Sequence, residues 1–419
     1  MIPYALLALA SAALPAPVPG APGVEVVWKA SIGESDLTFA ASDSAVFYLG
    51  RAADEDSKLE PGVVQVRTSS GALVRRVEYP WQNLSQIAVA GGRALFLSLA
   101  SEHEGGPMER PPPPSELWAM DVASGKRRWG FKFGETFASF RCEGAACFVG
   151  TCSGIVALDA ASGRVLWRSG AVGDAIVGGE TWFYEGLQVT PKAVYSVTSD
   201  DYGKVFLRAF SRATGKTVWA ARQDKAADGS MAVSATQVAV SWQTGGCNPK
   251  PKAKKCDKPD VLQIESFDQA RGASKWSKAI EGGEVVASDA DLLLASTAGF
   301  LVALEAVSGE ERWRVPMSVS SAPIDLNLFD QWLLTPAHAV GWSWDSSTKQ
   351  IALEWLDRKT GALVASWPVA PNLKDEDALG PRTVGFSGEL VFVSAHGQIQ
   401  ALRLKGASPS APAVPRRGD

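Results

Sequence analysis

The sequence IVALDAASGRVLW, residues 155–167, has the pattern of a β-strand, a tight turn and the start of a returning strand. Ile155, Val156 and Leu158 are β-prone apolar residues, and the run is too short for a helix and stops at a turn signal. Asp159 can accept hydrogen bonds from the turn amides, and Gly163 can adopt the positive φ that a reversal requires. An isolated hairpin of this kind is marginal in water, so we expect it to lie in a larger sheet.

Most of the chain consists of imperfect copies of this segment, each centred on a glycine. An apolar residue lies five positions before the glycine, and in five copies Trp lies four positions after it. The copies are 37 to 57 residues apart, which is typical of a four-stranded propeller blade with variable loops. The glycines are Gly71, Gly125, Gly163, Gly215, Gly272, Gly309 and Gly361, the tryptophans are Trp129, Trp167, Trp219, Trp276 and Trp313, and the first and last copies have Arg75 and Ala365 instead.

An eighth copy is divided between the two ends of the repeat region. Residues 24–28, VEVVW, have the pattern of the returning strand with its Trp, and residues 397–402, GQIQAL, have that of the strand before the turn. Pairing the two would complete one blade, close the ring and remove exposed sheet edges. The sequence therefore predicts an all-β protein, a single closed β-propeller of four-stranded antiparallel blades. Eight blades are expected, or seven if one degenerate copy is not a blade.

The motif A-L-D-A-x-S-G-x-x-x-W resembles the repeat of PQQ-type β-propellers, and the resemblance covers nearly all of residues 24–405. That family includes quinoprotein dehydrogenases and non-enzymatic envelope scaffolds such as the BamB-like outer-membrane assembly lipoproteins. The resemblance implies the fold, while both functional branches share it. The dehydrogenase branch uses a vicinal Cys-Cys pair against the quinone. This sequence has no adjacent cysteines, and none of that branch's cofactor ligands can be matched in it.

Composition gives little support for catalysis or for nucleic-acid binding. The formal net charge is −4 with mixed signs, so no basic stripe for nucleic acid is implied. The only three histidines, His103, His338 and His396, fall in or near loops and turns, with no catalytic spacing around them. We therefore expect no catalytic residue, no metal and no cofactor. The repeat tryptophans are expected to pack against the next blade, with each indole N–H bonded to backbone.

The two ends of the chain have a different composition from the repeats. Residues 1–23 contain the apolar run LLALASAAL at 6–14 and then a Pro-rich stretch. This segment resembles a secretory signal, although no Lys or Arg precedes the run and no lipoprotein Cys lies near it. The run is too short to span a bilayer comfortably, so no transmembrane segment is predicted. Residues 406–419 are rich in Pro, Ala and Ser and are expected to be disordered.

Long connections are expected at one end of the ring only. We label the strands of a blade A to D, from the central channel outward. Because successive strands alternate in direction, the A–B and C–D turns lie at one end of the ring and the B–C and D–A connections lie at the other. The A–B and C–D turns are short in the sequence. The expected B–C inserts are 50–62, 101–115, 244–260 and 337–349, and the expected D–A inserts are 77–84, 169–187, 220–229 and 368–382. Long loops on a rigid scaffold usually carry binding, and neutral drift in surface loops is the alternative.

Aromatic residues in or near these inserts are the candidate binding residues. Exposed aromatics are favoured at protein interfaces. The alternative is that these side chains fold over the channel mouth as a lid. The candidates are Tyr79, Trp81, Trp182, Phe183, Tyr184, Trp342 and Trp344.

The cysteines predict two disulfides and one free thiol. If Glu143 pairs with Ala146 across a two-residue turn, Cys142 lies directly opposite Cys147. Cys247 and Cys256 bracket a polar Lys-rich insert, where a bridge at its neck is expected. Cys152 is then left as a buried thiol, and the spacing of Cys142, Cys147 and Cys152 is atypical of a zinc site. Two bridges suit an oxidising compartment.

Three functions follow from these observations. The preferred hypothesis is a non-enzymatic scaffold, extracytoplasmic in the periplasm or cell envelope, whose long-loop face binds a protein partner. Envelope or outer-membrane protein assembly is one setting for this role, and the protein is expected to be a monomeric ring. The alternatives are a quinoprotein-type dehydrogenase and a carbohydrate or small-ligand binder. A Ca²⁺-ligating carboxylate cluster in the central channel would favour the dehydrogenase.

Overall fold

The computed structural model describes most of the strands and short turns of this chain. The described residues are 23–31, 39–50, 62–78, 84–98, 115–133, 137–151, 154–169, 185–199, 204–224, 226–244, 261–281, 284–297, 300–316, 332–345, 350–371, 383–395 and 398–405. The expectations for the N-terminal segment 1–22 and for the tail 406–419 lie outside these residues.

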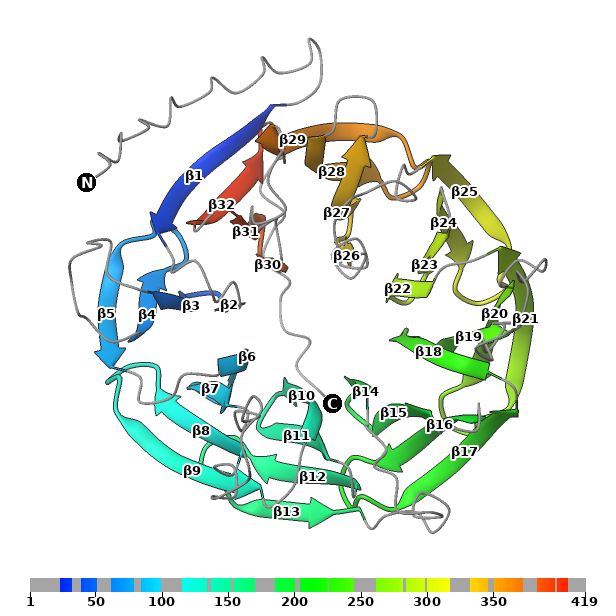
Figure 1. Ribbon diagram of the computed structural model, residues 1–419, viewed down its shortest axis with the longest axis horizontal. Coiled ribbons are helices and arrows are strands. Elements are labelled where there is room, and N and C mark those ends of the chain that lie inside the picture. Colours follow the sequence, from blue (N-terminus) through cyan, green and yellow to red (C-terminus); the bar gives the residue numbers. More distant parts are fainter. Residues whose placement is uncertain are drawn as a thin grey trace, which may run out of the picture.

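The strands form eight separate four-stranded antiparallel sheets, arranged as the blades of a ring (Figure 1). The prediction of a closed eight-bladed β-propeller is therefore confirmed. Blades 1 to 4 comprise β2 (Phe39–Ala41), β3 (Ala45–Gly50), β4 (Gly62–Arg67) and β5 (Leu73–Glu78); β6 (Leu84–Ala90), β7 (Arg93–Ser98), β8 (Ser115–Asp121) and β9 (Arg127–Phe133); β10 (Phe137–Glu143), β11 (Ala146–Thr151), β12 (Gly154–Asp159) and β13 (Val165–Arg168); and β14 (Glu185–Val189), β15 (Ala193–Ser199), β16 (Lys204–Ser211) and β17 (Thr217–Asp224).

The second half of the chain repeats this arrangement. Blades 5 to 8 comprise β18 (Ala226–Val233), β19 (Gln237–Thr244), β20 (Val261–Asp268) and β21 (Ser274–Glu281); β22 (Glu284–Ser288), β23 (Leu292–Thr297), β24 (Phe300–Glu305) and β25 (Glu311–Pro316); β26 (Trp332–Leu334), β27 (His338–Asp345), β28 (Gln350–Asp357) and β29 (Leu363–Pro371); and β30 (Thr383–Ser387), β31 (Leu390–Ala395), β32 (Gln398–Leu404) and β1 (Val24–Ser31). Strand A of each blade lies nearest the ring centre and strand D forms the outer wall (Figure 1).

Blade 8 is the divided blade that the sequence predicts. The N-terminal strand β1 pairs antiparallel with β32, and Val24 lies opposite Leu404. The N–H of Lys405 donates to the carbonyl of Gly23 at 2.8 Å, where the other blades have a covalent turn. The two ends of the ring therefore meet inside one sheet, which leaves no blade short of a strand.

Buried side chains form layers between neighbouring blades. Between blades 3 and 4, for example, Phe148, Ile155 and Trp167 pack with Val194 and Phe210. This follows from strand periodicity, since alternate residues of each strand face the preceding and the following blade. In the described part of the chain the core is thus divided among the inter-blade seams, and the stability of each blade depends on its neighbours.

Candidate interaction faces and the seams that hold them

The short-turn face contains the A–B turns of all eight blades and the C–D turns of blades 1 to 7, and all of these turns are among the described residues. In seven blades the first residue of the C–D turn donates its N–H to a carbonyl of the A–B turn in the same blade. Examples are Ala160 to Ala145 at 2.8 Å and Arg212 to Lys192 at 3.1 Å. Inner and outer turns are therefore joined by backbone hydrogen bonds, which makes this face a rigid base.

The repeat tryptophans join each blade to the next at this face. Their indole N–H groups donate to a C–D turn carbonyl of the following blade at 2.7 to 3.1 Å, as predicted. The pairs are Trp28 with Thr68, Trp129 with Ala160, Trp167 with Arg212, Trp219 with Gln269, Trp276 with Ala306 and Trp313 with Arg358. We call each pair, together with the turn glycine beneath the indole, a Trp–Gly latch.

Two separate constraints, one on the backbone and one on packing, require glycine at this turn position of the following blade. In each latch it has a φ between 64° and 73°, which L side chains rarely adopt. A Cβ on it would also lie 2.3 to 2.8 Å from the indole ring. The glycine that anchors the repeat in the sequence is thus the receptor for the preceding blade's tryptophan.

Two seams depart from this pattern, at the copies without Trp. Arg75 takes the place of the indole over Gly125, and its guanidinium donates to the carbonyl of Ala123. Ala365 faces the divided blade 8, which has no C–D turn and hence no turn glycine to receive an indole. The loss of Trp at this copy therefore follows from the closure of the ring.

Trp342 lies in the seam between blades 7 and 8, so the expectation that it is an exposed loop aromatic is wrong. It lies within β27 and is fully buried, in a core layer that also contains Trp355, Ala365, Val391 and Leu402. The expected insert 337–349 is likewise wrong, because β27 occupies most of it. Trp344 also lies in β27, opposite Ile351. The side chains of Trp342 and Trp355 pack in the seam between blades 7 and 8, which has no latch.

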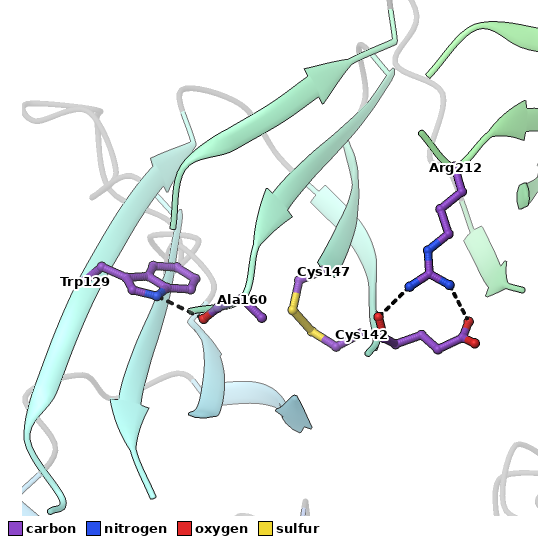
Figure 2. The surroundings of a disulfide bond; sticks show 6 residues. Trp129, Cys142, Cys147, Ala160 and Arg212 are labelled. Atoms are coloured by element: carbon purple, nitrogen blue, oxygen red, sulfur yellow. Dashed lines mark hydrogen bonds and ion pairs between the residues drawn. A yellow bond between two sulfur atoms is a disulfide. The ribbon is translucent and has the colours of Figure 1, made fainter. Parts of the chain in front are cut away.

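A disulfide joins Cys142 and Cys147 in the hairpin of β10 and β11, as predicted. The two cysteines are opposite each other in register, next to the pair Glu143 and Ala146. Figure 2 shows the bond between two inter-blade contacts. On one side Trp129 donates to Ala160, and on the other Arg212 donates to the carbonyl of Glu143 at 2.7 Å and lies 3.5 Å from its carboxylate. The hairpin itself contacts blade 4 through Glu143, and Cys147 packs with blade 2 in a shared core layer. The predicted bridge of Cys247 and Cys256, and Cys152, lie outside the described residues.

Acidic side chains on this face are engaged by neighbours of their own blade or the next. Asp121 accepts hydrogen bonds from the N–H and hydroxyl of Ser124 and forms salt bridges with Arg93 and Arg128. The Ser124 hydrogen bonds, with a smaller contribution from Arg128, lower the pKa of Asp121 to about 2. Asp289 forms a salt bridge with Arg358 of the next blade. These carboxylates act as turn and seam residues.

The opposite face carries the B–C and D–A connections. The longest of these connections lie outside the described residues, namely 51–61, 99–114, 170–184, 245–260, 317–331 and 372–382. Tyr79, Trp81, Trp182, Phe183 and Tyr184 lie in such segments, so their role stays a prediction. The expected insert 220–229 is wrong, because β17 and β18 run through it. The segment 317–331 was missed by sequence reasoning, although the wide spacing between Gly309 and Gly361 is a signal for it.

Among the described residues, no group of three or more His, Cys, Asp and Glu residues lies close enough together to hold a metal ion. Among the same residues, no helix is present that is long and apolar enough to cross a bilayer.

The ring of blades with Trp–Gly latches defines the class of protein as a PQQ-like β-propeller. The family model of the outer membrane protein assembly factor BamB matches residues 113–246 and 262–406, so the chain belongs to this family. No curated protein gives a significant match.

Two solved structures show the same fold at low sequence identity, and a third is less similar. BamB from Moraxella catarrhalis has a TM-score of 0.59 at 15% identity, covering 92% of this chain and 99% of that one. The computationally designed Ika8 protein has a TM-score of 0.59 at 14% identity, covering 89% and 98%. A europium-containing methanol dehydrogenase has a TM-score of 0.47 at 13% identity, covering 88% and 76%.

Proposed function

We propose that this chain is a non-enzymatic extracytoplasmic scaffold that binds a protein partner in the cell envelope through its long-loop face. One observation carries the proposal. The tight turns of the short-turn face are hydrogen-bonded into a base, and the long connections leave from the other end of the ring. A rigid base with variable loops at the opposite end is the usual arrangement of a binding scaffold.

Two further observations support the same proposal. The family match is to an outer membrane protein assembly factor. The long connections contain Tyr79, Trp81 and the run 182–184, WFY. Aromatic side chains of this kind supply much of the binding energy at protein interfaces.

The experiment is site-specific photo-crosslinking in envelope extract, followed by affinity measurement with the partner so identified. A photoreactive residue at position 182 should capture the partner, whereas one at Val307, which is 62% exposed on the short-turn face, should not. Replacing Trp182 and Tyr184 by Ala should then weaken affinity by roughly thirtyfold or more, since a buried interface aromatic contributes about 2 kcal/mol.

The matched control is Phe386→Ala, which removes an aromatic ring that is 48% exposed beside the A–B turn of blade 8. We expect it to leave affinity unchanged. Capture at 307 and loss of affinity in the control, with the Trp182/Tyr184 variant unaffected, would show that the wrong face has been assigned. Reduction of a dye by the protein supplied with PQQ, Ca²⁺ and an alcohol would contradict the non-enzymatic assignment.

A further inference from the structure

Three neighbouring blades carry a cation at the same exposed position of the C–D turn. The residue after the turn glycine is Lys126 in blade 2, Arg164 in blade 3 and Lys216 in blade 4, and all three are exposed. The equivalent residues of blades 1, 5, 6 and 7 are Ala72, Ala273, Glu310 and Ala362. The cations therefore form an arc along the outer rim of the short-turn face, confined to blades 2 to 4. We call these three residues the basic arc.

The nearby carboxylates are already used within the fold. Asp121 is bonded to Ser124 and to two arginines, and Glu143 contacts Arg212. Asp159 accepts hydrogen bonds from Ser162, which lower its pKa, and Arg164 adds a smaller Coulombic contribution. In the described part of the chain none of the three arc cations forms a salt bridge. The arc thus presents net positive charge to solvent.

The same half of the ring is basic as a whole. Among the described residues, Lys and Arg outnumber Asp and Glu in blades 1 to 4, whereas the reverse holds in blades 5 to 8. Arg67 and Lys192 are further exposed cations on the short turns of blades 1 and 4. A chain with a net charge of −4 therefore has a strongly one-sided distribution of charge.

Exposed apolar side chains lie beside two of the arc cations. Leu166 is 40% exposed and Val218 is 52% exposed, each two residues beyond Arg164 and Lys216 on the outer strands β13 and β17. Leu166 and Val218 are the extra residues of the β-bulges near the start of these strands. The rim therefore combines cations with apolar side chains, which is the composition that favours the headgroup and acyl boundary of a bilayer.

We propose that the basic arc binds an anionic lipid surface, so that blades 2 to 4 rest on phospholipid headgroups at the rim of the short-turn face. The three cations are long and separated, on different blades without a shared cavity, so they suit an extended negative surface rather than one small anion. This binding leaves the opposite, long-loop face free, and its readout does not depend on the protein capture proposed above.

The test is co-sedimentation of the whole protein with vesicles of phosphatidylglycerol and phosphatidylcholine, and with phosphatidylcholine alone, at low salt. We expect binding to the anionic vesicles only, weakened by added salt because exposed charges are screened. Each arc cation contributes about fivefold in affinity, so the triple variant Lys126→Gln, Arg164→Gln and Lys216→Gln should lose on the order of a hundredfold.

The matched control changes three exposed cations on the other blades, Arg271→Gln, Lys359→Gln and Lys29→Gln, which alters the net charge equally. We expect its binding to stay within a few-fold of the wild type, and both variants to keep the wild-type melting temperature. Equal losses in the two variants would overturn the proposal, as would wild-type protein that ignores anionic vesicles. Binding of the arc to polyglutamate but not to vesicles would also overturn it, in favour of an acidic protein partner.

Discussion

At the scale of single residues, the latch glycines combine a backbone requirement with a packing requirement. Gly215 has a φ of 69°, and a Cβ on it would lie 2.3 Å from the indole of Trp167. Gly92 has a φ of 71°, but nothing lies within 4 Å of a Cβ placed there. The two glycines share the backbone cost of a side chain and differ only in the contact with the neighbouring blade.

We expect Gly215→Ala to be much more destabilising than Gly92→Ala. Both substitutions incur about 1 kcal/mol for the left-handed backbone. Gly215→Ala must in addition displace the indole, which adds about 1 to 3 kcal/mol for overpacking. Urea unfolding of the two variants measures the difference. Equal losses would mean that the indole moves without cost and that the latch contributes little to stability.

At the scale of elements, the β10–β11 hairpin is linked to the blades on both sides of it. Its disulfide lies beside Glu143, which contacts Arg212 of blade 4. The carbonyl of Ala145 in its turn accepts the N–H of Ala160. The carbonyl of Ala160 in turn accepts the indole N–H of Trp129 from blade 2. Cys147 is fully buried in the layer between blades 2 and 3. The bond therefore restrains a hairpin on which contacts to two neighbouring blades depend.

We expect reduction of Cys142–Cys147 to lower the free energy of unfolding by about 2 kcal/mol, the loop-entropy value for so short a loop. The variant Cys247→Ser/Cys256→Ser isolates this bond, and urea unfolding with and without a reductant measures its contribution. Non-reducing peptide mapping of the wild type should recover Cys142 with Cys147, and Cys247 with Cys256. Five free thiols in protein from its native compartment would contradict the pairing and the extracytoplasmic assignment.

At the scale of the whole molecule, stability depends on closure, because the core is distributed over the seams between blades. β1 supplies the outer strand of blade 8, and its Trp28 donates to Thr68 of blade 1 at 2.7 Å. The adjoining seam to blade 7 has no latch and depends on packing around Trp342 and Trp355. A closed ring leaves no blade face exposed, so the loss of one strand opens two apolar surfaces at once.

Deletion of residues 24–30 is therefore expected to lower the melting temperature of the whole ring. The deletion removes the β1–β32 pairing and the Trp28 latch together, and calorimetry should show a single transition at lower temperature. Deletion of residues 406–419 is the control and should leave the transition in place. An unchanged melting temperature after the first deletion would mean that β1 is not needed for closure.

The sequence by itself determined the fold, the divided blade, the latch tryptophans and the Cys142–Cys147 pair. These depend on local rules, namely strand alternation, turn glycines and register across a two-residue turn, and the repetition of those rules made the prediction secure. Trp342 could not be placed in this way, because a Trp in an unmatched stretch has the same local pattern in an exposed insert as in a buried strand.

Only the tertiary structure showed that the copy with Ala365 faces the divided blade 8, where no turn glycine could receive an indole, and that Trp342 packs in that seam. The one-sided basic arc is likewise a tertiary feature. Lys126, Arg164 and Lys216 are far apart in the chain, and the packing of blades 2 to 4 against one another places them side by side on one rim.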